Sequence, residues 1–241
     1  MKILVPDYYS KFRCIAGRCR HTCCKGWEID VDEESLPRFL NDTFISPHVE
    51  LSDTPHIRLE EDEKCPFLRA DGLCEMIVRS GEKSLCQICR DHPRFRNFWT
   101  GITEIGLGFV CGTAAELILG WPEKMKLTVL EDDGAEEPVP DDEQWLINLR
   151  CDLLEKITDT GPHARLREYL IYRHLADALY DGRVDERIRF IDEAYSEITG
   201  RWKHTDGSLP EIAEAARQWS YDVEYDEEVL EKRISGGLIT D

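Results

Sequence analysis

The chain has 241 residues, and 49 Asp and Glu against 30 Lys and Arg give it a formal net charge of −19. This length is enough for one large domain or two small ones, and hydrophobic residues make up 41% of the chain, which excludes wholesale disorder. The negative charge argues against general nucleic-acid binding and against docking on anionic lipid, because both require a basic face.

The start of the sequence has no signal-peptide core. Its apolar residues, ILV, are followed at once by Pro6 and Asp7. No stretch of the sequence approaches the roughly 20 consecutive apolar residues that span a bilayer. We therefore expect a cytoplasmic protein without a membrane partner, in a compartment where thiols stay reduced.

The first half of the chain is predicted to contain loops and short elements. Trp27, Ile29 and Val31 alternate with acidic residues, which is typical of a short strand. Residues 114–119 are predicted to form a helix. Because Pro, Gly and Cys dominate between these elements, we expect something other than a conventional hydrophobic core to organise this region.

An acidic segment, EDDGAEEPVPDDE at 131–143, separates the two halves of the chain. It contains two prolines and few apolar residues, which favours an exposed linker or loop. We therefore predict a cysteine-rich metal-cluster region at 1–120, an acidic linker or loop at 121–143, and a helical bundle at 144–241.

The second half shows apolar residues at helical spacing in the segments 146–157, 166–179 and 184–198, with a shorter helix at 209–219. Gly-Pro and Asp-Gly pairs separate the longer segments. The predicted fold class is mainly α. A loop-rich N-terminal half, organised by cysteines and metal and containing a short strand or two, packs on a C-terminal helical bundle.

Nine of the ten cysteines lie in the first half, in short-spaced groups. Such spacings allow one loop to present several thiolates to one centre, and the turn signal Asp71-Gly72 predicts that the two cysteines flanking it come together. The predicted metal ligands are Cys14, Cys19, Cys23, Cys24, Cys65, Cys74, Cys86, Cys89 and Cys111.

Three interpretations of these cysteines compete. Packing as small buried residues suits the isolated Cys151, whereas disulfides are disfavoured in the cytoplasm. Metal binding explains the crowding best, and both zinc and iron–sulfur clusters accept four thiolates. The paired C-x2-C pattern of a zinc ribbon is missing, and proline follows Cys65 as in bacterial ferredoxins. These features favour a 4Fe-4S cluster, with zinc as the alternative and either one or two sites.

Four blocks of motifs occur in order over residues 5–120. They are PDYY-x2-F-x-C leading into C-x4-C-x3-CC-x-GW-x-I, then CPFL-x2-DGLCE, GE-x2-L-C-x2-CR-x2-PR, and C-x2-AA-x-LIL. This pattern resembles the flagellin lysine-N-methylase family, and its second and third blocks resemble the broader zinc- or iron-chelating cysteine-cluster proteins. The resemblance implies a 4Fe-4S cluster and S-adenosylmethionine-dependent methylation of lysine side chains on flagellin.

Methyl transfer to lysine requires a neutral amine and a site for a sulfonium donor, which aromatic or acidic walls attract. The catalytic candidates near the cysteines are Tyr8, His21, Asp91 and His92. The candidates for binding the donor are the aromatic walls Trp27 and Trp99, with Tyr9, and the carboxylate-binding Arg90 and Arg94. Each has a structural alternative: the tryptophans could belong to a core, the histidines to the surface, and the arginines could donate hydrogen bonds to sulfur or to loop carbonyls.

The sequence thus predicts an iron–sulfur-dependent protein lysine N-methyltransferase that uses S-adenosylmethionine and acts on a lysine-bearing protein such as flagellin. The alternatives are a non-catalytic zinc- or iron-binding cysteine-cluster protein and an iron–sulfur redox protein. Neither nucleic acid nor membrane is an expected partner, and the sequence leaves the oligomeric state open.

Overall fold

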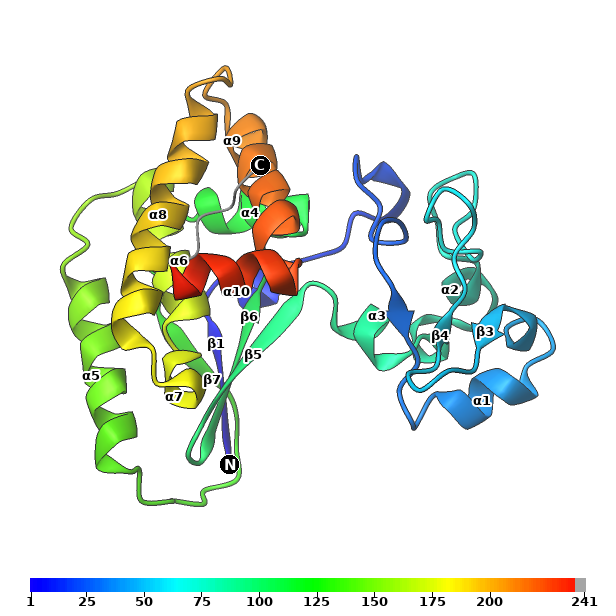
Figure 1. The fold of residues 1–241 in the computed structure, drawn as a ribbon, viewed down its shortest axis with the longest axis horizontal. Helices are drawn as coiled ribbons and strands as arrows, with labels where there is room; N and C mark the ends of the chain where they lie inside the picture. The colour runs from blue at the N-terminus through cyan, green and yellow to red at the C-terminus, as the bar shows by residue number, and fades with distance from the viewer. Residues whose placement is uncertain (237–241) are drawn as a thin grey trace. The chain divides into compact units, whose positions relative to one another are not determined.

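The computed structural model describes residues 1–236, which form two compact units (Figure 1). The larger unit combines Met1–Arg13 with the chain from Pro93 onward, and the smaller unit is Cys14–His92. The smaller unit is therefore an insertion between the first strand of the larger unit and the rest of it. Both junctions between the units lie outside residues 121–143, the linker or loop predicted from the sequence.

A four-stranded sheet lies at the centre of the larger unit, in the order β5-β6-β1-β7. Strand β1 runs parallel to β6 and antiparallel to β7, while β5 and β6 form a hairpin around Thr100-Gly101. The hairpin tip and the N-terminus lie at the same end of the sheet in Figure 1. The strands are β1 Lys2–Pro6, β5 Arg94–Trp99, β6 Ile102–Leu107 and β7 Leu127–Asp132.

Helices supply most of the core of the larger unit. Helix α6 is buried around most of its circumference, as its sequence predicts, and it packs against α4, α5 and α8. The Asn97 side-chain amide on β5 donates a 2.9 Å hydrogen bond to the carbonyl of Tyr172 on α6, which fastens the sheet to the helices. The helices are α4 Gly112–Leu119, α5 Asp141–Glu155, α6 Pro162–His174, α7 Ala178–Asp181, α8 Val184–Trp202, α9 Leu209–Trp219 and α10 Glu227–Ser235, with a 3-10 turn at Tyr9–Lys11 and a π-helical turn at Ser220–Glu224.

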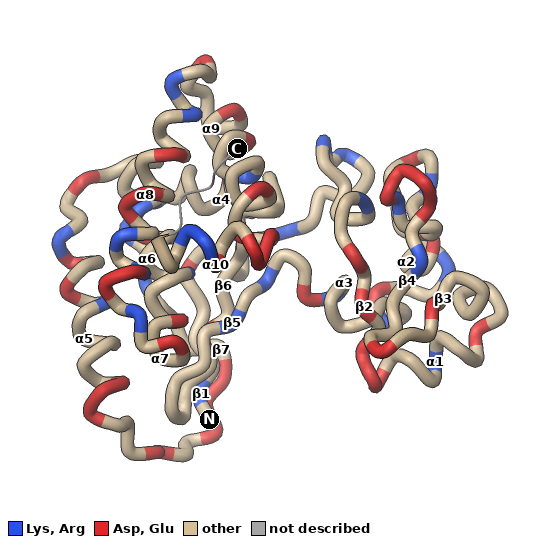
Figure 2. The backbone as a smooth tube through the Cα atoms, viewed as in Figure 1, with Lys and Arg blue, Asp and Glu red and all other residues tan. Residues whose placement is uncertain are grey.

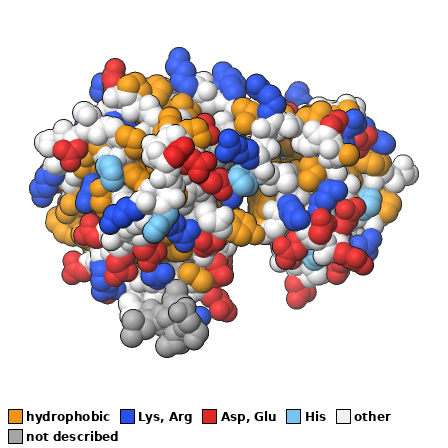
Figure 3. Space-filling view, turned by 90° about the horizontal axis from the view of Figure 1, so that it is seen from above, with side chains coloured by type: hydrophobic (Ala, Val, Ile, Leu, Met, Phe, Trp, Pro, Cys, Tyr) orange, Lys and Arg blue, Asp and Glu red, His pale blue; other side chains and the backbone are white. Residues whose placement is uncertain are grey.

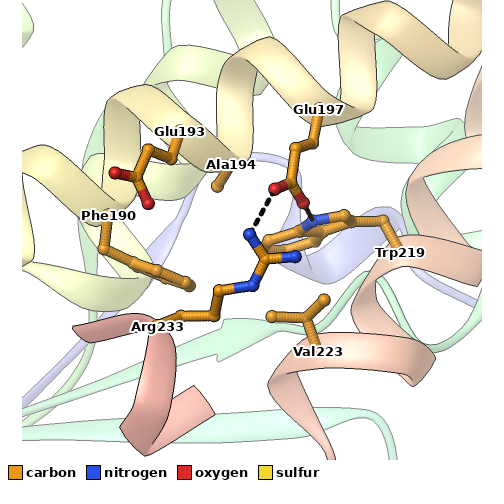
Figure 4. Close-up of a pocket in the computed structure, with 7 residues that line it drawn as sticks. All are labelled: Phe190, Glu193, Ala194, Glu197, Trp219, Val223 and Arg233. Carbon is orange, nitrogen blue, oxygen red and sulfur yellow. Dashed lines mark hydrogen bonds and ion pairs between the residues drawn. The ribbon is translucent and has the colours of Figure 1, made fainter. Parts of the chain in front are cut away.

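The last helix is held to the bundle through Glu197 of α8. One carboxylate oxygen of Glu197 lies 2.6 Å from an Nη atom of Arg233 on α10, and the other accepts a 3.0 Å hydrogen bond from the indole of Trp219 on α9 (Figure 4). Arg233 crosses the hollow between these helices and leaves no room for a water molecule there. This hollow is therefore a packing contact and does not serve as a ligand pocket.

The smaller unit is built from short elements around a small apolar core. Its three-stranded sheet has the order β2-β4-β3, and the core includes Phe39, Ile57 and Phe67 together with two cysteines. The elements are β2 Ile29–Asp30, β3 Val49–Glu50, β4 His56–Ile57, α1 Leu36–Asn41, α2 Glu75–Ser80 and α3 Gln87–Asp91, with 3-10 turns at Ala16–Arg18, Ser46–His48 and Glu82–Ser84.

The mainly α prediction is confirmed, but the strand content is larger than the sequence suggested. Residues 1–236 contain seven strands rather than one or two. The predicted linker or loop at 121–143 is also not a simple linker, because it contains β7 at the edge of the sheet. The last five residues of the expected bundle, 237–241, lie outside the described residues.

Charge is distributed over both units, as Figure 2 shows for the backbone. Three acidic residues occupy the first turn of α5, where they complement the positive end of the helix dipole. Basic and acidic side chains are interspersed on the face seen in Figure 3. Within residues 1–236, none of the helices combines the length and the apolar character needed to cross a bilayer.

Candidate metal centre

Five thiols gather in the smaller unit, contributed by three separate segments of the chain. Cys65 and Cys86 are buried in its core, and three half-buried cysteines, Cys24, Cys74 and Cys89, pack against that same core. The backbone N–H of Cys65 donates a 2.8 Å hydrogen bond to the carbonyl of Cys24, and Cys74 forms a β-bridge with Leu68. We call these five residues the inner thiols.

Two of the inner thiols occupy helix starts. Cys74 immediately precedes α2 and Cys86 immediately precedes α3. The backbone amides of Met76 and Ile77 act to lower the pKa of Cys74, and the amide of Cys89 acts to lower that of Cys86. Donors of this kind at a helix N-terminus stabilise a thiolate, which is the form that binds metal.

The pKa values of the inner thiols are shifted in different directions by burial and by hydrogen bonds to neighbouring cysteines. Burial raises the pKa of Cys65 to about 12, and it also raises the pKa of Cys74. A hydrogen bond from Cys23 lowers the pKa of Cys24 to about 7 against the opposing effect of burial. Cys89 hydrogen bonds to Cys86, which lowers the pKa of Cys86 and raises its own. Several thiolates this close together would repel one another, so they require a cation that compensates their charge.

As the side chains stand, no three His, Cys, Asp or Glu residues in 1–236 are arranged to hold a metal ion. The metal-organised N-terminal half expected from the sequence is therefore not confirmed. What the structure does contain is a suitable donor set: adjacent sulfur atoms, backbone donors to two of them, and an apolar surround that includes Ile29, Phe67 and Met76. The chemistry of this donor set fits zinc or an iron–sulfur cluster.

The other four predicted ligands are not part of the apolar core that contains the inner thiols. Cys14, Cys19 and Cys23 belong to the exposed segment that opens the smaller unit, where the thiol of Cys19 donates a 2.6 Å hydrogen bond to the carbonyl of His21. Cys111 belongs to the larger unit, directly before α4. None of the ten cysteines, all of which fall within residues 1–236, forms a disulfide.

Five of the predicted donor-binding and catalytic residues lie in the smaller unit, as do the inner thiols. The indole of Trp27 donates a 2.8 Å hydrogen bond to the carbonyl of Cys23, and its ring faces that of His92 with 5.7 Å between centroids. Arg90 and Asp91 directly follow Cys89 on α3. His21 is exposed near the start of the unit.

Three other predicted site residues have packing partners in the larger unit. The Tyr8 hydroxyl donates to the sulfur of Met125, and burial raises the pKa of Tyr8 well above its ordinary value. Arg94 donates a 2.8 Å hydrogen bond from Nε to the hydroxyl of Tyr9. Trp99 is buried beneath a guanidinium 4.7 Å from its ring. The sequence placed all three near the cysteines because they are close to them along the chain.

Sequence reasoning missed the buried polar pairs of the larger unit. Arg150 on α5 makes two hydrogen bonds of 2.6 and 2.7 Å to Glu104 on β6. Nε2 of His174 lies 2.9 Å from a carboxylate oxygen of Glu224. The only available signal for either pair was a charged residue within an otherwise apolar segment.

The smaller unit therefore brings five cysteines from three segments to one apolar core. The chain is similar to the lysine-N-methylases of Salmonella typhimurium and Salmonella choleraesuis, each 27% identical over 196 residues, which cover 75% of this chain and 48% of each relative. It is also 27% identical over 134 residues to the flagellar biosynthetic protein FliU of Salmonella muenchen, covering 51% of this chain and 79% of FliU. These similarities support a relationship with the flagellin lysine methylase family.

The chain spans about half the length of the two lysine-N-methylases that it matches. No family model matches the chain, and no solved structure matches it.

Proposed function

We propose that the protein is an iron–sulfur-dependent lysine N-methyltransferase that uses S-adenosylmethionine and acts on a lysine-bearing protein of the flagellin type. The observation that carries the proposal is the similarity to two lysine-N-methylases over 75% of this chain. The inner thiols support the metal part of the proposal, because five thiols from three segments lie in or against one apolar core.

In this proposal the inner thiols hold a 4Fe-4S cluster, with zinc as the alternative metal. Four thiolates complete such a cluster, so five inner thiols include one more than it needs. When bound, the cluster would supply an iron site that can anchor the amino and carboxylate groups of the methyl donor. Hydrogen bonds from the amides of Met76, Ile77 and Cys89 would stabilise the sulfur ligands.

The residues around the inner thiols have side chains suited to a sulfonium donor. The paired rings of Trp27 and His92 present π faces, which attract a cation. Arg90 has a guanidinium that can take the donor's carboxylate in bidentate fashion, and Asp91 beside it carries a negative charge. We assign donor binding to this group in preference to Arg94 and Trp99, which have packing partners in the larger unit.

The reaction itself is a direct transfer of a methyl group. The lone pair of the neutral lysine amine forms the new carbon–nitrogen bond as the carbon–sulfur bond of the donor breaks, leaving a thioether and a methylated ammonium. Since a free lysine has a pKa near 10.4, the site must remove a proton from it first. Asp91 and His92 are the acceptors that we propose near the rings, with His21 as a further candidate.

A non-catalytic metal-binding module is the second candidate function. It is favoured by the coverage of the relatives, because the chain matches only 48% of each lysine-N-methylase. A module of this kind would use the inner thiols to bind zinc or iron without any methyl donor.

The decisive experiment is donor binding by metal-loaded full-length protein. Anaerobically purified protein should be brown and contain about four irons and four sulfides per chain, and calorimetry should show binding of S-adenosylmethionine. A His92→Gln variant should weaken that binding, whereas His204→Gln, an exposed histidine of the larger unit, should not. Cluster-loaded protein that binds no donor would overturn the methyltransferase proposal, and a colourless protein with stoichiometric zinc would favour the second candidate.

A further inference from the structure

A cavity of about 640 Å³ opens on the smaller unit, between the segment that contains α1 and the segment that contains α2. Its lining comes from residues 38–45 on one side and from 76–84 on the other. Pockets that bind small molecules have volumes of roughly 300–1,000 Å³, so this cavity is large enough for a metabolite. The comparisons assign no function to it.

The cavity is positively charged in a chain that is strongly negative. Arg38, Arg79 and Lys83 line it, and Asp42 is the one carboxylate among the described lining residues. That carboxylate is already engaged, because its Oδ1 accepts a 2.8 Å hydrogen bond from the backbone N–H of Phe44. Residues 14–92 as a whole carry ten basic and sixteen acidic side chains, so the net charge of the cavity lining is opposite in sign to that of the unit.

Two of the three cationic side chains, Arg79 and Lys83, have hydrogen-bond donors available for a ligand. Arg79 uses Nε for a 2.7 Å contact with Glu75 and lies over the ring of Phe44, 3.8 Å from its centroid. Among the hydrogen bonds and ion pairs of residues 1–236, those of Arg79 use Nε alone, and Lys83 forms none. Arg38 instead donates to the carbonyls of Ser84 and Leu85 and so fixes the two walls to each other.

We propose that this cavity binds a small organic oxyanion, a carboxylate or a phosphate, through Lys83 and the Nη groups of Arg79. Charge-assisted hydrogen bonds from these donors would hold the anionic end, and Phe44 and Met76 offer apolar surface to the rest of the ligand. Three cations disfavour a sulfonium, so this cavity is distinct from the donor site proposed above.

The cavity and the inner thiols share a wall. Met76 lines the cavity and also packs in the core that contains Cys65 and Cys86. Ser84 precedes Cys86 by two residues, and its hydroxyl donates a 3.0 Å hydrogen bond to the carbonyl of Met76. A bound oxyanion would therefore stabilise the segment between Cys74 and Cys86 and slow its hydrogen exchange.

The test is anion titration of the full-length, metal-loaded protein by calorimetry, with inorganic phosphate and citrate as separate probes and sodium chloride at matched ionic strength as the control. At least one probe should bind saturably, and hydrogen exchange at 75–85 should slow when it does. Lys83→Gln should weaken binding about tenfold, the effect of losing one charge-assisted hydrogen bond. Lys25→Gln removes an exposed lysine of the same unit that pairs with Asp62, and it should bind like the wild type.

The two probes identify the chemistry of the ligand: binding of phosphate alone assigns a phosphate site, and binding of citrate alone assigns a carboxylate site. Arg79→Gln provides a second variant, with its melting temperature measured because it also removes the contact with Glu75. The proposal fails if chloride reproduces the effect, if Lys83→Gln binds as tightly as Lys25→Gln, or if only an acidic polypeptide such as polyglutamate binds. It does not depend on methyltransferase activity, because its readout is anion binding.

Discussion

The backbone N–H of Cys65 donates a 2.8 Å hydrogen bond to the carbonyl of Cys24, joining two cysteine segments that lie far apart in the sequence. This contact aligns their side chains around one core, which also receives Cys86. Metal ligands held on separate segments depend on such backbone contacts, because each segment alone is too short to fold.

The first prediction concerns this contact and the ligands around it. Cys65→Ser should lose the metal and destabilise the smaller unit, because Cys65 is a buried inner thiol. Iron, zinc and sulfide analysis of anaerobic protein provides the measurement. Cys151→Ser is the matched control, since Cys151 is exposed on α5 of the larger unit, and it should keep the metal. Full metal content in Cys65→Ser would show that Cys65 is not one of the ligands.

Removal of the metal should affect the two units unequally. The smaller unit has short elements and a small core, whereas the larger unit has a sheet fastened to a helical bundle. After chelation, we expect the amides of 14–92 to exchange at least about tenfold faster, which corresponds to roughly 1.4 kcal/mol of lost local stability. Amides of α6 should be unchanged. Equal acceleration in both units, or none in either, would contradict a structural role for metal in the smaller unit alone.

The buried ion pair of Glu104 and Arg150 should be strongly sensitive to the loss of one partner. Both side chains are almost wholly buried, so Glu104→Gln leaves the guanidinium without its counter-charge. Such a change costs about 3–5 kcal/mol of unfolding free energy. The exposed pair of Arg183 and Glu231 is the control, and Glu231→Gln should cost less than about 1 kcal/mol. Denaturant unfolding measures both variants, and comparable losses in the two would refute the role of burial.

A fourth prediction concerns acid stability and the pair of His174 and Glu224. Burial lowers the pKa of His174 below its ordinary 6.5, although its hydrogen bond to Glu224 opposes the shift. Burial alone would raise the pKa of Glu224, but His174 and Arg173 hold it below its ordinary 4.5. Both groups therefore bind protons less readily in the folded state, so their stabilisation is complete at neutral pH and declines on acidification.

The decline starts as the pH falls through about 6.5, where His174 of the unfolded chain takes up a proton, and continues below about 4.5 through Glu224. Each group contributes a slope of at most about 1.4 kcal/mol per pH unit. His174→Gln should therefore reduce the loss of unfolding free energy between pH 7.5 and 5.5 by about 1 kcal/mol. His204→Gln should leave that loss unchanged, and an identical pH dependence in both variants would refute the prediction.

The sequence predicts helices better than strands in this protein, and the reason is the range of the interactions. The apolar residues of α8 recur at helical spacing within one segment, so this pattern can be recognised from the local sequence. Strand β1 pairs with β6, about a hundred residues further along, and no local pattern marks that partner. The turn Thr100-Gly101 was a local signal for the β5–β6 hairpin, but charged residues within both strands obscured the alternation.

The candidate site shows the same limit. The turn signal Asp71-Gly72 indicated that Cys65 and Cys74 would come together, and both pack in the same core, because the turn between them is local. Spacing did not separate the inner thiols from Cys14, which is exposed in the same unit, or from Cys111, which belongs to the larger unit. The cavity with Lys83 was also not predicted, because its two walls are not adjacent in the sequence.

Residues Cys14–His92 follow β1 in the sequence and precede the other strands of its sheet, so the smaller unit is synthesised before those strands. Every inner thiol emerges from the ribosome before β6 and β7, the two strands that flank β1 in the finished sheet. Metal can thus bind to a nascent chain in which β1 has not yet paired with β6 and β7.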